Sequence, residues 1–327
     1  MTHGGNVWQG DRPEAWLDFS ANLRPEGLPE WVKRALLAGV ERARYYPDPE
    51  MKRARAGLAA YAGVEPERIL PTPGGAAAID LALGLDAGRV LTDKVTFSEY
   101  ALRARVHGRP LGFLSDAPKP GDTLAICNPN NPTGAARSRE DLLLLAQKAK
   151  SAGARTLVDE AFIDFCPEYS LRKCASDSLL VAGSLTKILG APGVRLGYLC
   201  ASGDLISRME KMLVPWSLSS GAVEIAARLP EHLLEMRMDA QNNALRRERF
   251  AQALTLLGAR PLPSKANFLL CDFGRDMQGI AEDLKARGIL VRSCASFGLA
   301  GRFLRLAVKT DEENLILIEE LKKCLRS

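Results

Sequence analysis

Residues 178–195 read SLLVAGSLTKILGAPGVR, the segment of this chain that says most about its architecture. It begins with a short, continuously apolar run, which predicts a parallel strand that is covered on both faces. Lys187 follows directly after that run, and a glycine-rich turn leads on to Arg195. A lysine at the end of a buried strand is rarely there for packing, because its charge is costly to bury. The segment is therefore a candidate for chemistry.

The same rhythm continues on both sides of this strand. From about residue 50 to residue 212, apolar strand-like runs alternate with amphipathic helical stretches. Such alternation predicts an α/β fold in which helices cover both faces of a mostly parallel sheet. Ser138, followed three residues later by Asp141, predicts a helix start, and Gly153 predicts the end of that helix.

Beyond residue 213 the pattern changes. A long helical region precedes short strand candidates interleaved with helices, which predicts a smaller α+β domain. We expect three parts, with a boundary near Pro215: an N-terminal arm at 1–32 that joins the small domain, a large domain at 33–214 and a small domain at 215–327.

Composition excludes several classes of protein. The 327 residues carry a net charge of +5, but Lys and Arg alternate with Asp and Glu along the whole chain, so we expect no nucleic-acid partner. Seven cysteines without a CxxC pair indicate free thiols, no metal site and a reducing compartment. Neither a secretory signal nor a membrane-length apolar run is evident, so we expect a cytoplasmic protein. No GxGxxG follows the early strands, which argues against a nicotinamide-dependent dehydrogenase.

Polar residues gather at the ends of four predicted strands. Gly74 and Gly75 follow one strand, the stretch 128–134 (NPNNPTG) follows another, and Asp159 and Lys187 each follow a further one. In an open parallel sheet, ligands bind beyond the carboxyl ends of the strands. These four strand ends are therefore expected to face one crevice.

The residues in this crevice suit the chemistry of pyridoxal phosphate. A desolvated lysine can form an imine with a carbonyl, and this cofactor pairs such a lysine with an acid at its pyridine nitrogen. Lys187 and Asp159 fit these two roles. The cofactor phosphate would bind at the helix start in GGAAAIDLALGL, with Ser184 and Arg195 as further donors.

Three ordered motifs carry a resemblance over nearly the whole chain. NPNNPTG at 128–134, VDEAF at 158–162 and SLTKILGAPGVRLGY at 184–198 resemble fold-type I pyridoxal-phosphate enzymes of the class I/II aminotransferase superfamily, in the histidinol-phosphate aminotransferase branch. Within that branch, HGGN at 3–6 and LDFSANLRPEGLP at 17–29 look most like the threonine-phosphate decarboxylases of cobalamin biosynthesis.

The resemblance implies roles around the cofactor. Lys187 would form the imine and move protons, and Asp159 would pair with the ring nitrogen. Asn131 would bond the ring oxygen, although a turn asparagine is also possible. Tyr100 would stack on the ring, unless it is a core tyrosine. Tyr46, or else Tyr45, would reach the cofactor phosphate of a neighbouring subunit, which implies a homodimer with shared sites. The cofactor phosphate would be held by Gly74, Gly75, Ala76, Ser184, Thr186 and Arg195.

The resemblance also implies a doubly anionic substrate. Arg305 would bind its carboxylate and Arg292 its phosphate, with a structural salt bridge as the alternative for each. Asn131 would also contact the substrate. His3 and Asn22 would close over the substrate phosphate as a flap, although His3 also suits a frayed terminus. The family usually has an asparagine before the proline where this chain has Arg24.

Three functions remain open at this stage. The first is decarboxylation of L-threonine O-3-phosphate to 1-aminopropan-2-ol O-2-phosphate. The second is an aminotransferase for histidinol phosphate or an aromatic amino acid that uses 2-oxoglutarate. Phe162 leans against the second, because many aminotransferases of the branch carry a tyrosine there. The third, ranked last, is a non-catalytic sensor or scaffold that binds pyridoxal phosphate.

Overall fold

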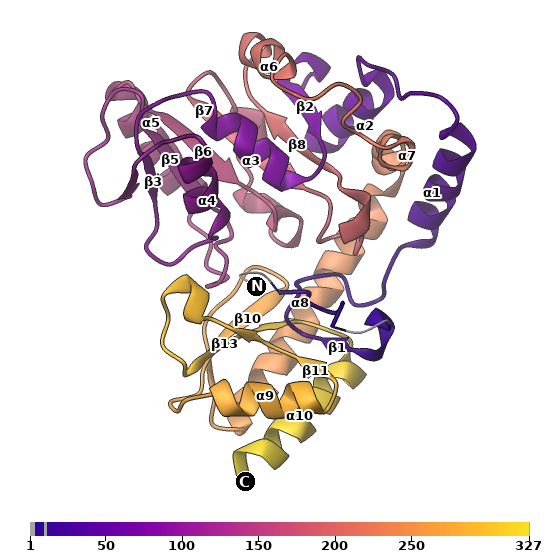
Figure 1. The fold of residues 1–327 in the computed structure, drawn as a ribbon, viewed down its shortest axis with the longest axis vertical. Coiled ribbons are helices and arrows are strands. Elements are labelled where there is room, and N and C mark those ends of the chain that lie inside the picture. Colours follow the sequence, from indigo (N-terminus) through magenta and orange to yellow (C-terminus); the bar gives the residue numbers. More distant parts are fainter. Residues whose placement is uncertain (1–3, 10–11, 327) are drawn as a thin grey trace.

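A seven-stranded sheet forms the larger lobe of the protein within residues 4–9 and 12–326, the part that the computed structural model describes (Figure 1). In spatial order its strands are β2 (Ile69–Thr72), β8 (Gly197–Cys200), β7 (Leu179–Ser184), β6 (Arg155–Asp159), β5 (Thr123–Cys127), β3 (Val90–Thr92) and β4 (Leu111–Phe113). All neighbours are parallel except β8, which runs antiparallel to β2 and β7. The turn from β7 to β8 contains no α-helix, so it reverses the chain instead of crossing over. The expected mostly parallel sheet is confirmed.

Helices flank this sheet in the larger lobe. They are α1 (Glu30–Arg42), α2 (Lys52–Ala62), α3 (Gly75–Leu83), α4 (Glu99–Val106), α5 (Arg139–Ser151), α6 (Gly203–Glu210) and α7 (Ser220–Arg228). The predicted start of α5 is confirmed, because the Ser138 hydroxyl accepts a hydrogen bond from the Asp141 amide at 3.0 Å. Strands β5, β6 and β7 are buried along almost their whole length because both of their faces are covered.

The smaller lobe joins the two ends of the described chain. Its antiparallel sheet has the order β12 (Arg292–Ser293), β13 (Phe303–Ala307), β10 (Phe268–Asp272) and β9 (Arg260–Pro261), and helices α9 (Gln278–Ala286) and α10 (Asp311–Arg326) complete the lobe. The early strand β1 (Leu17–Asp18) pairs in parallel with β11 (Ile289–Leu290). Phe19 therefore belongs to the core of this lobe, together with Phe250 and Leu306.

Helix α8 (Leu233–Leu256) links the two lobes (Figure 1). Met236 and Ala240, near its start, are part of the larger core, whereas Phe250 and Leu254 are part of the smaller one. Helix α7 packs against α1 and α2 in the larger lobe, although it follows the boundary expected near Pro215. The division at 1–32, 33–214 and 215–327 stays a prediction, and this packing favours a boundary within α8.

No helix among the described residues is both long enough and apolar enough to cross a bilayer. No group of His, Cys, Asp and Glu side chains in these ranges could hold a metal ion. The seven cysteines are all free thiols, and six of them are buried.

Candidate active site

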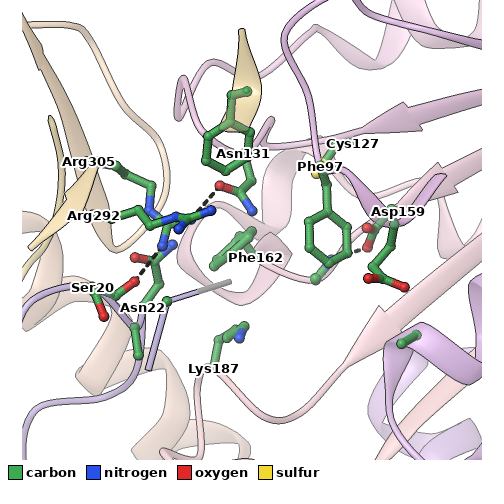
Figure 2. A pocket seen from close by; sticks show the side chains of 16 residues that line it. Ser20, Asn22, Phe97, Cys127, Asn131, Asp159, Phe162, Lys187, Arg292 and Arg305 are labelled. Carbon is green, nitrogen blue, oxygen red and sulfur yellow. Dashed lines mark hydrogen bonds between the residues drawn. The ribbon is translucent and has the colours of Figure 1, made fainter. Parts of the chain in front are cut away.

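A cavity of about 430 Å³ lies where the two lobes and the N-terminal segment meet (Figure 2). The carboxyl ends of β5, β6 and β7 open into it, as the parallel order of these strands requires. Its lining comes from three parts of the chain: Gly4, Ser20, Ala21 and Asn22; then Ala76, Phe97, Glu99, Cys127, Asn131, Asp159, Ala161, Phe162 and Lys187; and finally Arg292, Phe297 and Arg305.

Lys187 projects into this cavity from the turn after β7 (Figure 2). Its Nζ lies 5.9 Å from the centroid of the Phe162 ring. Burial, together with the nearby positive charges of Arg305 and Arg195, lowers the pKa of Lys187 to about 8, although the Asp159 carboxylate opposes the shift. The amine therefore loses its proton, and becomes nucleophilic, more readily than an exposed lysine would.

Asp159, the last residue of β6, is only 2% exposed. The Tyr100 hydroxyl donates a hydrogen bond to its Oδ2 at 2.6 Å, and the Ala161 amide donates to its Oδ1 at 3.0 Å. Burial raises the pKa of this carboxyl, and these hydrogen bonds and Lys187 partly oppose the shift. A buried carboxylate of this kind gains from a cationic partner on the cavity side, and a protonated pyridine nitrogen would provide one.

Tyr100 does not line this cavity, although we expected it to stack on the cofactor ring. It is fully buried in α4, behind Asp159, and its ring meets Phe97 edge-on at 5.8 Å. Phe97, just before the start of α4, lines the cavity instead. In this structure Tyr100 orients the acid, and Phe97 is the aromatic side chain on the wall.

The start of α3 forms a cradle beside the cavity. Gly74, its N-cap, has a φ of 92°, and a Cβ added there would lie 2.7 Å from Nη2 of Arg195. A Cβ added at Gly75 would lie 3.1 Å from Cβ of Ser184. Ala76 lines the cavity, and the Thr186 amide donates to the Ser184 hydroxyl at 3.4 Å. The predicted phosphate-binding residues thus converge on one helix start, which favours an anion.

Arg305 reaches the cavity from β13 and is 5% exposed. Its Nη1 donates to Oδ1 of Asn131 at 2.6 Å, and its Nη2 donates to the carbonyl oxygen of Ser20 at 2.5 Å. Its buried Nε has no hydrogen-bond partner among the described residues. Burial lowers the pKa of Arg305 to about 10. These contacts fix the guanidinium and leave its Nε among the donors that an anionic ligand could use.

Arg292 and Asn22 complete the polar wall opposite Lys187 (Figure 2). Nη2 of Arg292, on β12, donates to the Ser296 hydroxyl at 2.6 Å, and burial lowers the pKa of this arginine. Asn22 is 3% exposed, and its Oδ1 has no hydrogen-bond partner within the described ranges. The second predicted arginine therefore faces the same cavity as the first.

The tyrosines expected at the cofactor phosphate lie outside this cavity of their own chain. Tyr46 is 81% exposed and packs against Trp216 at 4.7 Å between ring centroids, outside this cavity. Tyr45, its competitor, is also exposed. His3 lies outside the described residues, so its expected flap role stays a prediction.

Sequence reasoning missed Ser20, Phe97, Cys127 and Phe297, which all line the cavity. Cys127 directly precedes NPNNPTG, so its place at a strand end was a usable signal. Phe97 belongs to the stretch that contains Tyr100, but only the start of α4 decides which aromatic faces inward. Ser20 contributes a backbone carbonyl, which leaves no mark in a sequence.

Comparisons with known proteins define the class of this protein. The family model for aminotransferase class I and II matches residues 14–321, so the chain belongs to that family. The threonine-phosphate decarboxylase of Salmonella typhimurium is 34% identical, over 99% of this chain and 96% of its own. A histidinol-phosphate aminotransferase of Mycobacterium bovis is 31% identical, over 90% of this chain and 84% of its own. The family resemblance of the three motifs is confirmed.

The fold comparison agrees with the family. The crystal structure of L-threonine-O-3-phosphate decarboxylase from Porphyromonas gingivalis superposes with a TM-score of 0.84 and covers 94% of this chain and 99% of its own. Its sequence is 23% identical, so the likeness concerns the fold. The expected fold-type I architecture is confirmed.

Proposed function

We propose that this protein is a pyridoxal-phosphate lyase that decarboxylates L-threonine O-3-phosphate for cobalamin biosynthesis. The observation that carries the proposal is one cavity in which Lys187 and Asp159 from the larger lobe face Arg292 and Arg305 from the smaller one. The similarity of this chain to a threonine-phosphate decarboxylase over nearly its whole length supports the same reaction. Two arginines suit a substrate with two anionic groups.

The residues present fit the cofactor. Enzymes of the class I and II aminotransferase family depend on pyridoxal phosphate. The α3 start would hold its phosphate through backbone amides, the Ser184 hydroxyl and the Arg195 guanidinium. Asp159 would hold its ring nitrogen, and Phe97 offers an aromatic wall. When bound, the cofactor supplies an electron sink for the electron pair that carbon dioxide leaves behind.

The protein's own groups bind and orient the substrate and move its protons. The Nε donor of Arg305, which is unpartnered within the described ranges, would bind the carboxylate, and Arg292 with Asn22 would bind the phosphate. With both anionic ends held, the bond to the carboxylate can be aligned for cleavage. After the bond from the α-carbon to the carboxylate has broken and carbon dioxide has left, Nζ of Lys187 would deliver a proton to that carbon.

Phe162 favours a lyase over a transaminase. Its ring packs edge-on against Phe268 at 5.1 Å and offers no hydroxyl to the cavity. A tyrosine at this position would add a hydrogen-bond donor near the ring oxygen of the cofactor. The apolar ring therefore gives the cofactor different electronics from those of a typical aminotransferase of this branch.

Assembly as a homodimer is part of the proposal. Tyr46 and Trp216 form an exposed aromatic pair, and Leu37, Val40 and Val214 are also exposed. Such apolar exposure is typical of a surface that another subunit covers. In a dimer, Tyr46 would reach the cofactor phosphate of the neighbouring subunit. We further infer that the enzyme works in the cytoplasm, since its thiols are free.

A second candidate is an aminotransferase that acts on histidinol phosphate. It is favoured by the 31% identity to the Mycobacterium bovis enzyme and by the two cavity arginines, which would also suit that phosphate. An aminotransferase needs an amino acceptor, whereas a decarboxylase turns over without one. This difference allows the two candidates to be separated in a single experiment.

The test is to incubate the protein, loaded with pyridoxal phosphate, with L-threonine O-3-phosphate and no keto acid, and to weigh the product by mass spectrometry. Repeated turnover to 1-aminopropan-2-ol O-2-phosphate, absent in Lys187→Ala, is the expected result. Unchanged substrate, together with turnover of histidinol phosphate once 2-oxoglutarate is added, would replace the lyase with the second candidate.

A further inference from the structure

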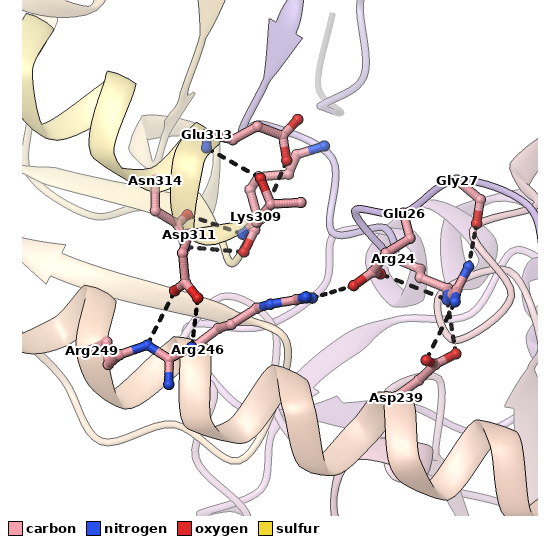
Figure 3. Close-up of polar contacts among 11 residues, drawn as sticks. Arg24, Glu26, Gly27, Asp239, Arg246, Arg249, Lys309, Asp311, Glu313 and Asn314 are labelled. Atoms are coloured by element: carbon pink, nitrogen blue, oxygen red, sulfur yellow. Dashed lines mark hydrogen bonds and ion pairs between the residues drawn. The ribbon is translucent and has the colours of Figure 1, made fainter.

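Arg24 lies where the N-terminal segment, the Lys187 turn and helix α8 meet. Its backbone amide donates to the carbonyl oxygen of Lys187 at 3.1 Å. Its guanidinium donates to both carboxylate oxygens of Asp239 on α8, from Nε at 2.8 Å and from Nη2 at 3.3 Å, and Nη1 donates to the Gly27 carbonyl at 2.9 Å (Figure 3). One residue thus contacts three parts of the chain.

The Arg24–Asp239 pair is well shielded from solvent. The two side chains are 12% and 19% exposed, and the two-pronged contact is the strong form of an arginine–carboxylate pair. A second pair joins Glu26 to Arg246, about two helical turns further along α8 (Figure 3). Because α8 spans both cores, these pairs tie the segment to the helix that links the lobes.

The same segment also forms part of the substrate side of the cavity. The Ser20 carbonyl accepts from Nη2 of Arg305, and the Phe19 carbonyl accepts from the Ala307 amide at 2.9 Å. Asn22 lines the cavity two residues before Arg24. Residues 19–24 therefore run from the substrate-binding arginine to the backbone of the reactive lysine.

Close packing holds the turn that carries Lys187 against this segment. Gly190 has a φ of 60°, and a Cβ added there would lie 3.2 Å from Cβ of Arg24 and 3.1 Å from the Gly27 carbonyl oxygen. No room for a side chain separates the turn from the segment, and the hydrogen bond from the Arg24 amide to the Lys187 carbonyl couples their positions.

We propose that Arg24 is a positioning residue that fixes the distance between Lys187 and Arg305 by anchoring residues 19–27 to helix α8. This inference rests on the proposed roles of those two residues, which Arg24 serves without touching the substrate. Removing the guanidinium leaves the shielded Asp239 carboxylate unpaired and loosens the segment beside the Lys187 turn, so the two ends of the substrate site are held less precisely. An asparagine at this position would be too short to form the same contacts with Asp239 and Gly27.

The test compares Arg24→Ala with Arg249→Ala in the holoenzyme. Arg249 is a matched control on the same helix, because it forms a two-pronged pair with Asp311, at 2.6 and 3.1 Å, that touches no part of the cavity. We expect Arg24→Ala to raise KM for L-threonine O-3-phosphate about tenfold or more and to lower kcat, whereas Arg249→Ala leaves both unchanged. Amide hydrogen exchange over residues 184–190 should become faster only in Arg24→Ala.

Two further variants separate positioning from general stability. Asp239→Ala should reproduce the effect of Arg24→Ala, and the double variant should lose no more than either one, because both remove the same contact. Arg24→Lys should raise KM less than Arg24→Ala does, since an ammonium keeps one bond to Asp239. A lower melting temperature in Arg24→Ala, with KM, kcat and exchange at 184–190 as in Arg249→Ala, would overturn the inference. A wild-type protein that neither binds pyridoxal phosphate nor turns over would instead refute the proposed function, and the exchange comparison would still test the anchor.

Discussion

At the scale of single residues, the site contains three ionisable side chains whose pKa values differ from their ordinary values. The pKa of Lys187 is lowered to about 8, that of Arg305 to about 10, and the pKa of Asp159 is raised. In each case burial is the largest cause. Such shifts are typical of reactive sites, where stability is given up for reactivity.

The first prediction concerns how much the buried Lys187 lowers the free energy of unfolding of the apoprotein. An unfolded chain keeps this proton up to the ordinary pKa of 10.5, whereas the folded protein releases it near 8. The unfolded state therefore binds more protons between these values, so the lysine is most destabilising below pH 8 and its cost fades as pH rises to 10.5. Lys187→Met should raise the free energy of unfolding by about 2 to 3 kcal/mol at pH 7.

Denaturant unfolding of the apoproteins at pH 7 and at pH 10 measures this difference. The control is Lys33→Met, because Lys33 is 56% exposed on α1 and should give the same small difference at both values. A stabilisation by Lys187→Met that does not change with pH would contradict the prediction.

The second prediction concerns the geometry of Arg305. A lysine at this position cannot donate to Asn131 and to the Ser20 carbonyl while also meeting a carboxylate. Arg305→Lys should therefore raise KM for L-threonine O-3-phosphate by about tenfold to a hundredfold, with unchanged affinity for the cofactor. Steady-state kinetics checks this. Arg302→Lys is the control, since Arg302 is half exposed and pairs with Asp272 instead; an equal effect in both variants would refute the role of Arg305.

At the scale of elements, the start of α3 is the part on which cofactor binding depends most. The helix begins at a glycine with positive φ, and the guanidinium of Arg195 occupies the space that a side chain on Gly74 would need. Ala76 and Ala77, in the first turn of this helix, offer neither a hydroxyl nor an acid. The anion must therefore rely on backbone amides, Ser184 and Arg195.

The third prediction tests this helix start. Gly74→Ala should weaken pyridoxal phosphate binding by about tenfold or more, because its Cβ displaces Arg195 and blocks the close backbone approach. Absorbance titration of the apoprotein gives the affinity. Gly258→Ala is the matched control, since Gly258 has a φ of 86° and no heavy atom within 4 Å of an added Cβ. It should lower the melting temperature through backbone strain alone; equal affinities in the two variants would contradict the prediction.

Elements and strand ends were largely predictable from the sequence, because their cause is local. Short, largely apolar runs predicted β5, β6 and β7, and the rule for parallel sheets then placed Asn131, Asp159 and Lys187 at one edge. Which of Tyr100 and Phe97 lines the cavity was not predictable, since it depends on where α4 begins. The contact between Ser20 and Arg305 was also hidden, because a backbone carbonyl joins residues from opposite ends of the chain.

At the scale of the whole molecule, one surface feature is the exposed aromatic pair of Tyr46 and Trp216. The described chain alone gives Tyr46 no contact with its own cavity. The sequence could suggest this arrangement only through resemblance, because no local pattern distinguishes a tyrosine that serves another subunit from one that faces solvent.

The fourth prediction is that inactive subunits complement each other. Lys187→Ala and Tyr46→Ala should each lose most of their activity. In a mixed dimer, one site combines Lys187 of one subunit with Tyr46 of the other and is intact. Refolding the two variants together at equal amounts should restore activity in about a quarter of the sites. Activity no greater than the sum of the separate variants would show that the sites are not shared.

The parallel pairing of β1 with β11 has a consequence for how the enzyme is made. The large sheet is complete once the ribosome has passed β8, so the lysine, its partner acid and the α3 cradle can assemble early. The segment that anchors the lysine turn must wait for α8 and β11, because it pairs with strands synthesised near the end. A nascent chain should therefore bind the cofactor only loosely, and tight retention should appear only once α8 and β11 have left the ribosome.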